Sequence, residues 1–314
     1  MKTKAWIAAL LVLGGLSRTV ASDQPPALPG DTIAEGKWRS LLDEDLSAWE
    51  SWMGSPHLSV TGLPDGTSKS ANGRGAPPMG LGNDPKHVFS VAVASGEPVL
   101  HVTGEIWGGL TTRESFSNYH LRLEVRWGGK KWEPRLNLPR NSGLLYHCTG
   151  PHGAFWNTWK RCLEFEVQEN DMGDLYPLGG TRAEVVLVKQ PSKIWIFDPV
   201  GGQSTSVGAG VMEPGGNRAA HRRGNFERPN GEWNTLELYT LGRTAVHVVN
   251  GQIVNVVRHT ALIAGSPAVE SPLEGGQLQL QSESTEVFYR RIQIQPITEF
   301  PPEIKRALDS AGQP

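Results

Sequence analysis

The segment Leu163–Gln168 contains the residue types and spacing that best fit catalysis. Its polar and apolar side chains alternate. Because side chains repeat every two residues along a strand, this pattern predicts a strand with Glu164, Glu166 and Gln168 on one face. Residues two apart lie roughly 6.6 Å apart, so two carboxylates could converge on one substrate or raise each other's pKa. This arrangement suits general acid and base catalysis.

Three more carboxylates follow this predicted strand at Glu169, Asp171 and Asp174. A loop at the strand end could direct them into a binding cleft. Two other interpretations stay open. An antiparallel sheet often solvates one polar face, and the acids could form an oxygen-rich cation site, although their spacing does not match the twelve-residue calcium loop of an EF-hand.

The segment Asn141–Cys148 predicts a second strand, and a bond between Cys148 and Cys162 would place it beside the acidic strand. In an oxidising compartment that bond would contribute about 3 kcal/mol by closing a loop. Two separate buried thiols are the alternative. Two cysteines alone do not make a structural zinc site, which takes four ligands.

Aromatic side chains follow Cys148 in the loop that leads to the acidic strand. His152, Phe155, Trp156, Trp159 and Arg161 lie within it. Aromatic faces stack on the C–H surfaces of sugars and polar groups bind hydroxyls, so aromatic residues beside acids suggest a carbohydrate site. Tryptophans in a sandwich also pack in the core or at its rim, so both roles remain open.

Alternating patterns separated by turn residues predict an all-β sandwich. They recur at 119–126, 183–188, 235–241 and 277–281. Leu121, Leu123 and Val125 of the first are expected in the core. Asn250-Gly251 predicts a type I′ hairpin turn between the runs 246–249 and 252–254.

The prolines near the C-terminus predict a short helix over Pro301–Leu308. Two glycine-rich stretches, Gly54–His87 and Gly201–Gly231, predict long loops, which in compact domains are usually functional or disordered. We expect them to form walls of a binding cleft.

Composition excludes several classes of function. The 314 residues carry a formal charge of −2, which gives no broad electrostatic reason to bind nucleic acid or an anionic membrane. The sequence has no GxSxG elbow, HExxH motif, Walker loop or dinucleotide fingerprint. Serine hydrolysis, zinc proteolysis and nucleotide chemistry are therefore disfavoured.

The N-terminus predicts export. A basic start, an apolar run over Ala5–Leu16 and small residues before Ser22 are typical of a secretory signal peptide. We expect a signal peptide over 1–21, a proline-rich linker over 22–35, a sandwich domain over 36–298 and a C-terminal tail over 299–314. The mature protein would then be periplasmic or extracellular in a bacterium and free of the membrane, with an uncleaved anchor as the alternative.

Several ordered motifs resemble one known family. They are Pro78–Leu81 with Asp84–Lys86, Gly104–Thr112, Asn141–Cys148, Glu166–Glu169, Gly231–Thr235 and Leu278–Glu283. Together they look like the 3-keto-disaccharide hydrolase domain family, over about Trp38 to Ile297. The resemblance implies a concanavalin-like jelly roll of two curved antiparallel sheets, with the ligand on the concave face, in exported bacterial proteins.

The resemblance also implies cleavage of glycosides oxidised at carbon 3, by 1,2-elimination and hydration. On this reading Glu166 is the base or acid, Gln168 is a donor, and Glu169 or Asp171 is the second acid or base, or a cation ligand. The residues expected to hold the sugar are Arg122, Tyr146, His147, Trp159 and Glu164. Tyr146-His147 stands where many relatives have Phe-Arg, so His147 would replace an arginine as oxyanion donor.

Two other functions remain open from the sequence, because the same fold hosts lectins and ordinary glycosidases. One is a non-catalytic, lectin-like sugar-binding module, and the other is an ordinary glycoside hydrolase with two carboxylates. The expected partner is a glycoside of mono- or disaccharide size. The sequence requires no cofactor, and a divalent cation, for which Glu169, Asp171 and Asp174 are the candidate ligands, is compatible with it.

Overall fold

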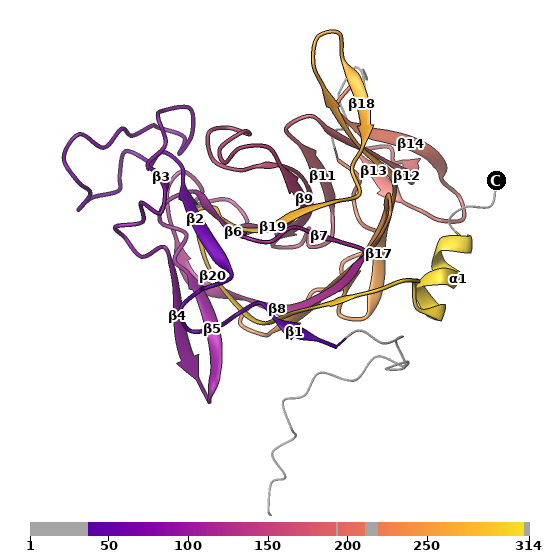
Figure 1. The fold of residues 1–314 in the computed structure, drawn as a ribbon, viewed down its shortest axis with the longest axis horizontal. Coiled ribbons are helices and arrows are strands. Elements are labelled where there is room, and N and C mark those ends of the chain that lie inside the picture. Colours follow the sequence, from indigo (N-terminus) through magenta and orange to yellow (C-terminus); the bar gives the residue numbers. More distant parts are fainter. Residues whose placement is uncertain (1–36, 193, 211–218, 311–314) are drawn as a thin grey trace, which may run out of the picture. The chain divides into compact units, whose positions relative to one another are not determined.

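The computed structural model describes residues 37–192, 194–210 and 219–310, and in these ranges strands predominate. The strands form two antiparallel sheets (Figure 1), as predicted. The predicted signal peptide and linker lie outside the described residues, so both remain predictions.

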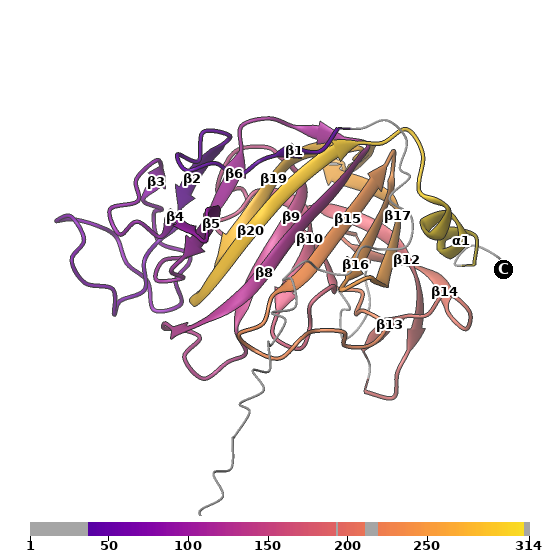
Figure 2. The same cartoon turned by 90° about the horizontal axis from the view of Figure 1, so that it is seen from below.

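The larger sheet has 12 strands within the described ranges. In spatial order its main path is β13 (Trp195–Phe197), β12 (Thr181–Lys189), β17 (Gln252–Ala264), β16 (Thr244–Val249), β15 (Asn234–Leu241), β8 (Tyr119–Lys131), β20 (Thr285–Pro296), β5 (Glu97–Val102) and β4 (Phe89–Ala94). Outside that path, β1 (Arg39–Ser40) pairs with β20, β14 (Gln203–Gly208) with β12, and β18 (Val269–Pro272) with β17. Figure 2 shows β20, β8, β15, β16 and β17 side by side.

The smaller sheet has eight strands within the same ranges. Its spatial order is β11 (Leu175–Leu178), β10 (Arg161–Gln168), β9 (Asn141–Thr149), β19 (Gly275–Ser282), β6 (Gly108–Thr112), β2 (Trp49–Met53) and β3 (Gly80–Leu81), and β7 (Phe116–Ser117) pairs with β19. In Figure 1 this sheet lies above β8 and β20 of the larger one.

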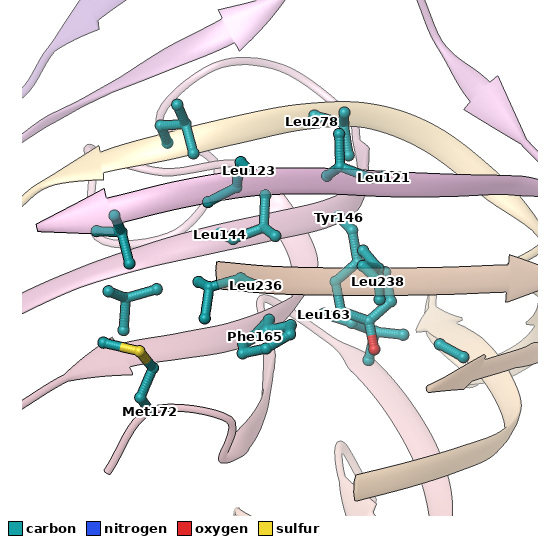
Figure 3. Packing of buried hydrophobic residues seen from close by; sticks show 14 of the residues in the cluster. Leu121, Leu123, Leu144, Tyr146, Leu163, Phe165, Met172, Leu236, Leu238 and Leu278 are labelled. Carbon is teal, nitrogen blue, oxygen red and sulfur yellow. The ribbon is translucent and has the colours of Figure 1, made fainter. Parts of the chain in front are cut away.

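Apolar side chains from the two sheets meet to form the core (Figure 3). Leu121 and Leu123 of β8 are at most 1% exposed, and Leu163 and Phe165 of β10 are fully buried. Burying a side chain of this size contributes about 1.5–3 kcal/mol. Because alternate residues of a strand point to opposite faces, Glu164 must point away from this core.

The local sequence predictions are confirmed. The four alternating segments lie in β8, β12, β15 and β19, and 141–148 lies in β9. Asn250 and Gly251 have φ values of +49° and +78° between β16 and β17, as a type I′ turn requires.

The predicted C-terminal helix is present as α1 (Pro302–Ser310), inside the expected tail. Ile304 of α1 is buried in the core, and the Arg258 guanidinium donates to the Leu308 carbonyl at 2.6 Å. In the described part of the chain no helix has the length and apolarity needed to cross a membrane.

Some strands were not predicted. β2 and β4 precede the first segment for which we predicted a strand, and β14 lies inside the expected loop Gly201–Gly231. The sequence of β4, FSVAVA, lacks an alternation of apolar with charged residues, and this strand forms one edge of the sheet. The sequence of β14, QSTSVG, is polar along most of its length.

Cys148 and Cys162 are buried free thiols. Burial is the main cause that raises the pKa of Cys162, and the neighbouring Cys148 raises it further. Both belong to a second apolar cluster, with Trp107, Leu145 and Trp159, on the outer side of the smaller sheet. The two thiols therefore lie together, as the predicted pairing of β9 and β10 requires, without a bond between them.

We expect Phe165→Ala to lower the free energy of unfolding by about 3–5 kcal/mol, because it empties a fully buried site. Chemical denaturation monitored by tryptophan fluorescence measures the change. Val200→Ala is the control, since Val200 is 89% exposed and should be neutral. Equal effects of the two substitutions would contradict the assignment of Phe165 to the core.

Candidate active site

Strand pairing brings a set of polar side chains together on the outer face of the smaller sheet. Glu164 lies opposite Tyr176 of β11, and Glu166 lies opposite Gly143 of β9. Directly opposite residues point to the same side of a sheet. We call the following residues the acidic face: Asn141, Glu164, Glu166, Tyr176, Gln281 and Glu283.

A glycine makes room for the acidic face. A Cβ atom at Gly143 would lie 2.4 Å from Glu164 Oε1 and 2.6 Å from Gln281 Oε1. Both distances are far below normal van der Waals contact. The missing side chain therefore allows a carboxylate and an amide to lie across β9.

The three carboxylates of the acidic face are covered. Glu164, Glu166 and Glu283 are each 6% exposed. Burial is the main cause that raises all three pKa values, and for Glu164 and Glu166 repulsion between the carboxylates is the next. The pKa of Glu283 rises to about 7 although Arg135 and Asn141 lower it. The cluster therefore retains protons near neutral pH.

Four buried polar atoms in this cluster have no hydrogen-bond partner among the described residues. They are Glu166 Oε1, Gln281 Oε1, Asn141 Oδ1 and Arg135 Nε. Buried polar groups in folded proteins nearly always have partners. Four exceptions in one cluster indicate a site that a polar ligand can complete.

Arg135 is the nearest cation to these carboxylates. Its Nη1 lies 3.3 Å from Glu283 Oε1, and its Nη2 donates to Gln168 Oε1 at 2.7 Å. The Gln168 amide in turn donates to Asp171 Oδ2 at 2.7 Å. Gln168 therefore links Arg135 to Asp171 and helps to orient the guanidinium group.

The acids that follow β10 are held by cations and amides. Glu169 pairs with Arg140 at 3.2 Å and accepts from Asn230. Burial acts to raise the pKa of Glu169, but these partners outweigh it and the pKa is lowered. Glu169 is therefore an ionised partner in an ion pair.

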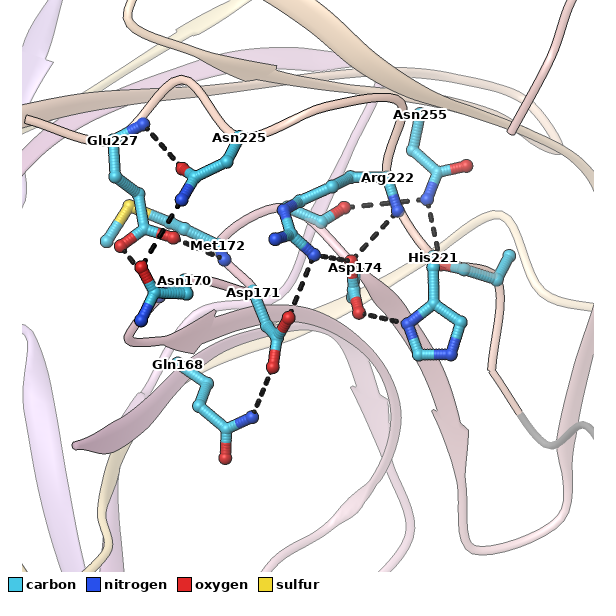
Figure 4. Close-up of polar contacts among 12 residues, drawn as sticks. Gln168, Asn170, Asp171, Met172, Asp174, His221, Arg222, Asn225, Glu227 and Asn255 are labelled. Atoms are coloured by element: carbon cyan, nitrogen blue, oxygen red, sulfur yellow. Dashed lines mark hydrogen bonds and ion pairs between the residues drawn. The ribbon is translucent and has the colours of Figure 1, made fainter. Parts of the chain in front are cut away.

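Asp171 and Asp174 share Arg222, whose Nη1 lies 3.0 Å from an oxygen of each (Figure 4). Asp174 also accepts from His221 Nδ1 at 2.5 Å. Within the described ranges, no three His, Cys, Asp or Glu side chains are arranged to hold a metal ion. The expected ligands Glu169, Asp171 and Asp174 contact protein cations instead.

Two of the residues that we expected to hold the sugar, Arg122 and Trp159, make other contacts. Arg122 points away from the core on the larger sheet, because Leu121 and Leu123 point into it, and its guanidinium lies 4.9 Å from the Trp38 ring centre. Trp159 is 2% exposed, stacks on Trp107 and donates to the Gly108 carbonyl. Arg122 therefore lies on the other sheet from Glu166, and Trp159 is packed in the apolar cluster with Cys162 and Leu145 on the outer side of the smaller sheet.

Tyr146 and His147 lie in the interior as well. Both are fully buried, and the Tyr146 hydroxyl lies 3.0 Å from His247 Nε2 between the sheets. β9 has an irregular register here, with φ of +51° at His147, which turns the imidazole toward Tyr119. Burial lowers the pKa of His147 to about 4, so it is neutral, and its ring lies beside Tyr119 in the interior rather than at the acidic face.

The two long loops bring charged residues toward the acidic face. The charge of Arg74, from the first loop, lowers the pKa of Glu283, and His221 and Arg222 come from the second. Two surface pockets of about 350 and 480 Å³ lie elsewhere, one lined by Trp49 and Glu50 among others and one by residues near Phe226. Neither pocket includes the carboxylates of the acidic face.

A family model, the 3-keto-alpha-glucoside-1,2-lyase-like domain, matches residues 37–295. The chain belongs to this family. The match covers both sheets and every residue of the acidic face, and it confirms the resemblance found in the sequence. It identifies a carbohydrate-active domain.

Solved structures resemble this chain at low identity. A candidate glycosyl hydrolase from Parabacteroides distasonis is 14% identical, with 83% of this chain and 100% of that one covered and a TM-score of 0.43. Bacillus licheniformis β-glucanase is 12% identical, with 84% and 98% covered and a TM-score of 0.36. The carbohydrate-binding module CBM66 of Bacillus subtilis is 9% identical, with 66% of this chain and 91% of that one covered and a TM-score of 0.36. Similarities of this size carry no information on activity.

The search of curated proteins finds no significant match.

The sequence analysis did not identify several residues of the acidic face, nor Arg135 beside it. Gln281 and Glu283 belong to the motif Leu278–Glu283, and its alternation could have placed them on one face. Tyr176 carries a weaker signal, because β11 has only four residues. Arg135 lies in a loop and carries no pattern at all.

Glu283 predicts an unusual pH dependence of stability. Its pKa rises from the ordinary 4.5 to about 7 on folding, so the folded state takes up a proton between these values and stability falls as the pH rises through them. Glu283→Gln should remove part of that fall. Thermal unfolding midpoints of wild type and variant from pH 4 to 8 measure it, and we expect their difference to grow in favour of the variant.

The matched control is Glu286→Gln, because the pKa of Glu286 is lowered. Burial acts against this shift, and the hydrogen bonds from His101 and from the amides of Gly129 and Lys130 outweigh it. The ionised Glu286 side chain therefore stabilises the folded state at neutral pH, and this stabilisation is lost in acid. The control should therefore be less stable than wild type at pH 7, and parallel curves for all three proteins would contradict the assignment.

Proposed function

We propose that this protein cleaves glycosides already oxidised at carbon 3, by 1,2-elimination followed by hydration of the resulting 2-hydroxy-glucal. The observation that carries the proposal is Glu166. It is a buried carboxylate with a raised pKa and one oxygen, Oε1, that has no partner among the described residues. The family match supports a substrate of this class.

The chemistry needs a base of raised strength. A carbonyl at carbon 3 acidifies the hydrogen on carbon 2, and a carboxylate can remove it. Raising the pKa of a carboxylate strengthens it as a base at neutral pH. The electron pair from the C–H bond then moves into an enolate, which expels the oxygen at carbon 1. Water adds to the product to complete a net hydrolysis.

The enolate oxygen needs hydrogen-bond donors. The unpartnered Arg135 Nε–H is one candidate, and the Tyr176 hydroxyl is another. Burial, followed by the charges of Glu166 and Asp174, raises the pKa of Tyr176, so its hydroxyl keeps its proton and can donate. Donors fixed in a site that excludes water stabilise a developing oxyanion strongly.

The carboxylates act as a coupled group. Glu164, Glu166 and Glu283 repel one another, so the first proton to leave the group makes the next harder to remove. One ionised carboxylate beside protonated neighbours provides a base together with additional donors. Glu166 takes the role of base because Glu283 pairs with Arg135 and Glu164 interacts with Gln281.

The proposal extends to the substrate and the compartment. The substrate is a glycoside of mono- or disaccharide size, and no cofactor takes part in the steps given above. The N-terminal pattern supports export to the periplasm or the medium.

The first experiment offers the protein a disaccharide and its 3-keto derivative in parallel. We expect turnover of the 3-keto sugar alone, followed by ultraviolet absorbance of the enone intermediate and by chromatography of released sugar. Turnover of the unoxidised disaccharide alone would instead assign an ordinary glycosidase. Binding of either sugar without turnover would assign a lectin-like module.

Glu166→Gln should lower kcat by about 10²–10⁴-fold, the usual contribution of a general base. Its melting temperature should stay the same or rise, because the amide matches the protonated carboxyl group in size and cannot acquire a buried charge that Glu164 would repel. The control is Glu237→Gln, at a buried carboxylate hydrogen-bonded to His120 on the larger sheet. It should lower stability and spare kcat, and the reverse pattern in the two variants would exclude Glu166 as the base.

Gly143→Ala should lower kcat at least tenfold, because the new methyl group displaces the ends of Glu164 and Gln281. The change in melting temperature should be small, since both are ends of flexible side chains. Gly129→Ala is the control, because its Cβ would meet nothing within 4 Å. Steady-state kinetics and thermal unfolding measure both effects, and full activity in Gly143→Ala would argue against a catalytic acidic face.

A further inference from the structure

Asp174 lies directly beside Glu166. The Glu166 amide donates to the Asp174 carbonyl, and the Gly173 amide donates to the Glu166 carbonyl, each at 2.9 Å. The next residues, Phe165 and Leu175, are paired in β10 and β11. Adjacent strands are about 4.8 Å apart, and opposite residues share a face. The Asp174 side chain is therefore the neighbour of the Glu166 side chain.

Asp174 is fully buried and fixes the orientation of His221 (Figure 4). Its Oδ2 accepts from His221 Nδ1 at 2.5 Å, and its Oδ1 accepts from the amide and Nη1 of Arg222 at 2.9 and 3.0 Å. With the Nδ1 proton directed at Asp174, the second ring nitrogen, Nε2, is the one left to exchange protons.

Backbone hydrogen bonds hold His221 in place. Its amide donates to the Trp195 carbonyl, and its carbonyl accepts from the Phe197 amide, both at 2.8 Å. The preceding residue, Ala220, forms two hydrogen bonds with Leu175 of β11. The backbone of His221 is therefore held next to the start of β11, which Asp174 directly precedes.

His221 Nε2 is available to a ligand. It has no hydrogen-bond partner among the described residues, and the side chain is 22% exposed. In Figure 4 the imidazole, the Asp171 carboxylate and the Gln168 amide point to the same side. Gln168 shares the outer face of β10 with Glu166, so His221 opens toward the side on which a sugar at Glu166 would lie.

The surrounding charges favour a protonated imidazole. The hydrogen bond with Asp174 is the main cause that raises the pKa of His221, and the charges of Asp174 and Asp171 add to it. Burial and the charge of Arg222 act in the opposite direction. His221 can thus carry a proton near neutral pH and release it to a stronger base.

We propose that His221, held by Asp174, is the proton donor to the leaving oxygen in the reaction proposed above, on which this inference rests. Glu166 takes the proton from carbon 2 and leaves an enolate; as the enolate expels the oxygen at carbon 1, that departing oxygen takes the proton from His221 Nε2. In the hydration step, water adds to carbon 1 and gives a proton back to Nε2, while Glu166 returns its proton to carbon 2. The two steps sum to hydrolysis, and both side chains end in their starting states.

The test compares two leaving groups in His221→Gln. A 3-keto-glucoside of 4-nitrophenol releases a stable anion and needs little protonation, whereas a methyl 3-keto-glucoside needs a proton donor. We expect the variant to lose about 10²–10⁴-fold in kcat on the methyl glycoside and less than about tenfold on the nitrophenyl glycoside. Equal losses on both substrates, or no loss on either, would overturn the proposal.

Proton exchange at carbon 2 separates this inference from the proposed function. Proton NMR in D₂O follows exchange of the carbon 2 hydrogen of the 3-keto substrate. Wild type and His221→Gln should both catalyse it, and Glu166→Gln should not. If wild type catalyses neither exchange nor cleavage, the proposed function fails and the role of His221 fails with it. If wild type does both and His221→Gln cleaves the methyl glycoside at the wild-type rate, only the role of His221 fails.

A pH profile of the wild type gives a readout that needs no variant. With the methyl glycoside, kcat should fall as the pH rises through the pKa of His221, which lies above its ordinary 6.5. With the nitrophenyl glycoside this alkaline fall should be absent, and the same fall on both substrates would contradict the proposal. His259→Gln is the matched control, because His259 is 64% exposed and pairs with Glu184 on the larger sheet. It should leave both profiles unchanged.

Discussion

The burial of three carboxylates on one face of the smaller sheet is the constraint on which the rest of the site depends. A buried charge is costly, and like charges close together add to the cost. Glu164, Glu166 and Glu283 meet this cost by keeping protons, as their raised pKa values indicate. Apolar residues at these positions, like Leu163 and Phe165 on the opposite face, would avoid this cost. The carboxylates therefore lower stability relative to an apolar cluster.

The neighbouring polar residues form a continuous chain that limits this cost. Arg135 links Glu283 to Gln168, and Gln168 links Arg135 to Asp171. Arg222 then joins Asp171 to Asp174, which holds His221. The chain alternates cations or amide donors with acids, so each buried charge has a partner of opposite sign or a hydrogen-bond donor. Glu166 lies next to this chain of contacts, and its Oε1 has no hydrogen-bond partner among the described residues. This unpartnered oxygen distinguishes Glu166 from the other acids as the candidate base.

The resulting site combines features that catalysis of an elimination requires. A carboxylate of raised pKa, neutral donors and a histidine fixed by a buried aspartate lie along adjacent strands. The positions of Glu166 and Tyr176 depend on backbone pairing between β9, β10 and β11, and strands hold side chains more precisely than loops do. His221 comes from the second long loop, and hydrogen bonds from its backbone to Trp195 and Phe197 hold it in place. The loops contribute Arg74 and Arg222, which adjust the electrostatics of groups that the sheet has already positioned.

The sequence predicted the strands that have a clear alternation and missed those without one. The core contains Leu121, Leu123, Leu163 and Phe165. Apolar residues that alternate along a strand share one face, and that face must be the buried one. β4 and β14 lack that period. The same rule placed Glu164 and Glu166 on the face opposite to the core. The expectation that Tyr146 and His147 hold the sugar came from the family resemblance; the structure places Tyr146 opposite Leu163 on the core face and His147 at an irregular register of β9.

By itself, then, the sequence determined an all-β chain, its family and the strand that carries Glu166, because these follow from local periodicity and short motifs. Only the tertiary structure decided which distant residues join that strand. Arg135, Tyr176, His221 and Glu283 reach it from separate parts of the chain, and Arg122 lies on the other sheet. The physical reason is that hydrogen-bonded pairing between strands, and not separation along the chain, fixes which side chains share a face and which are buried together.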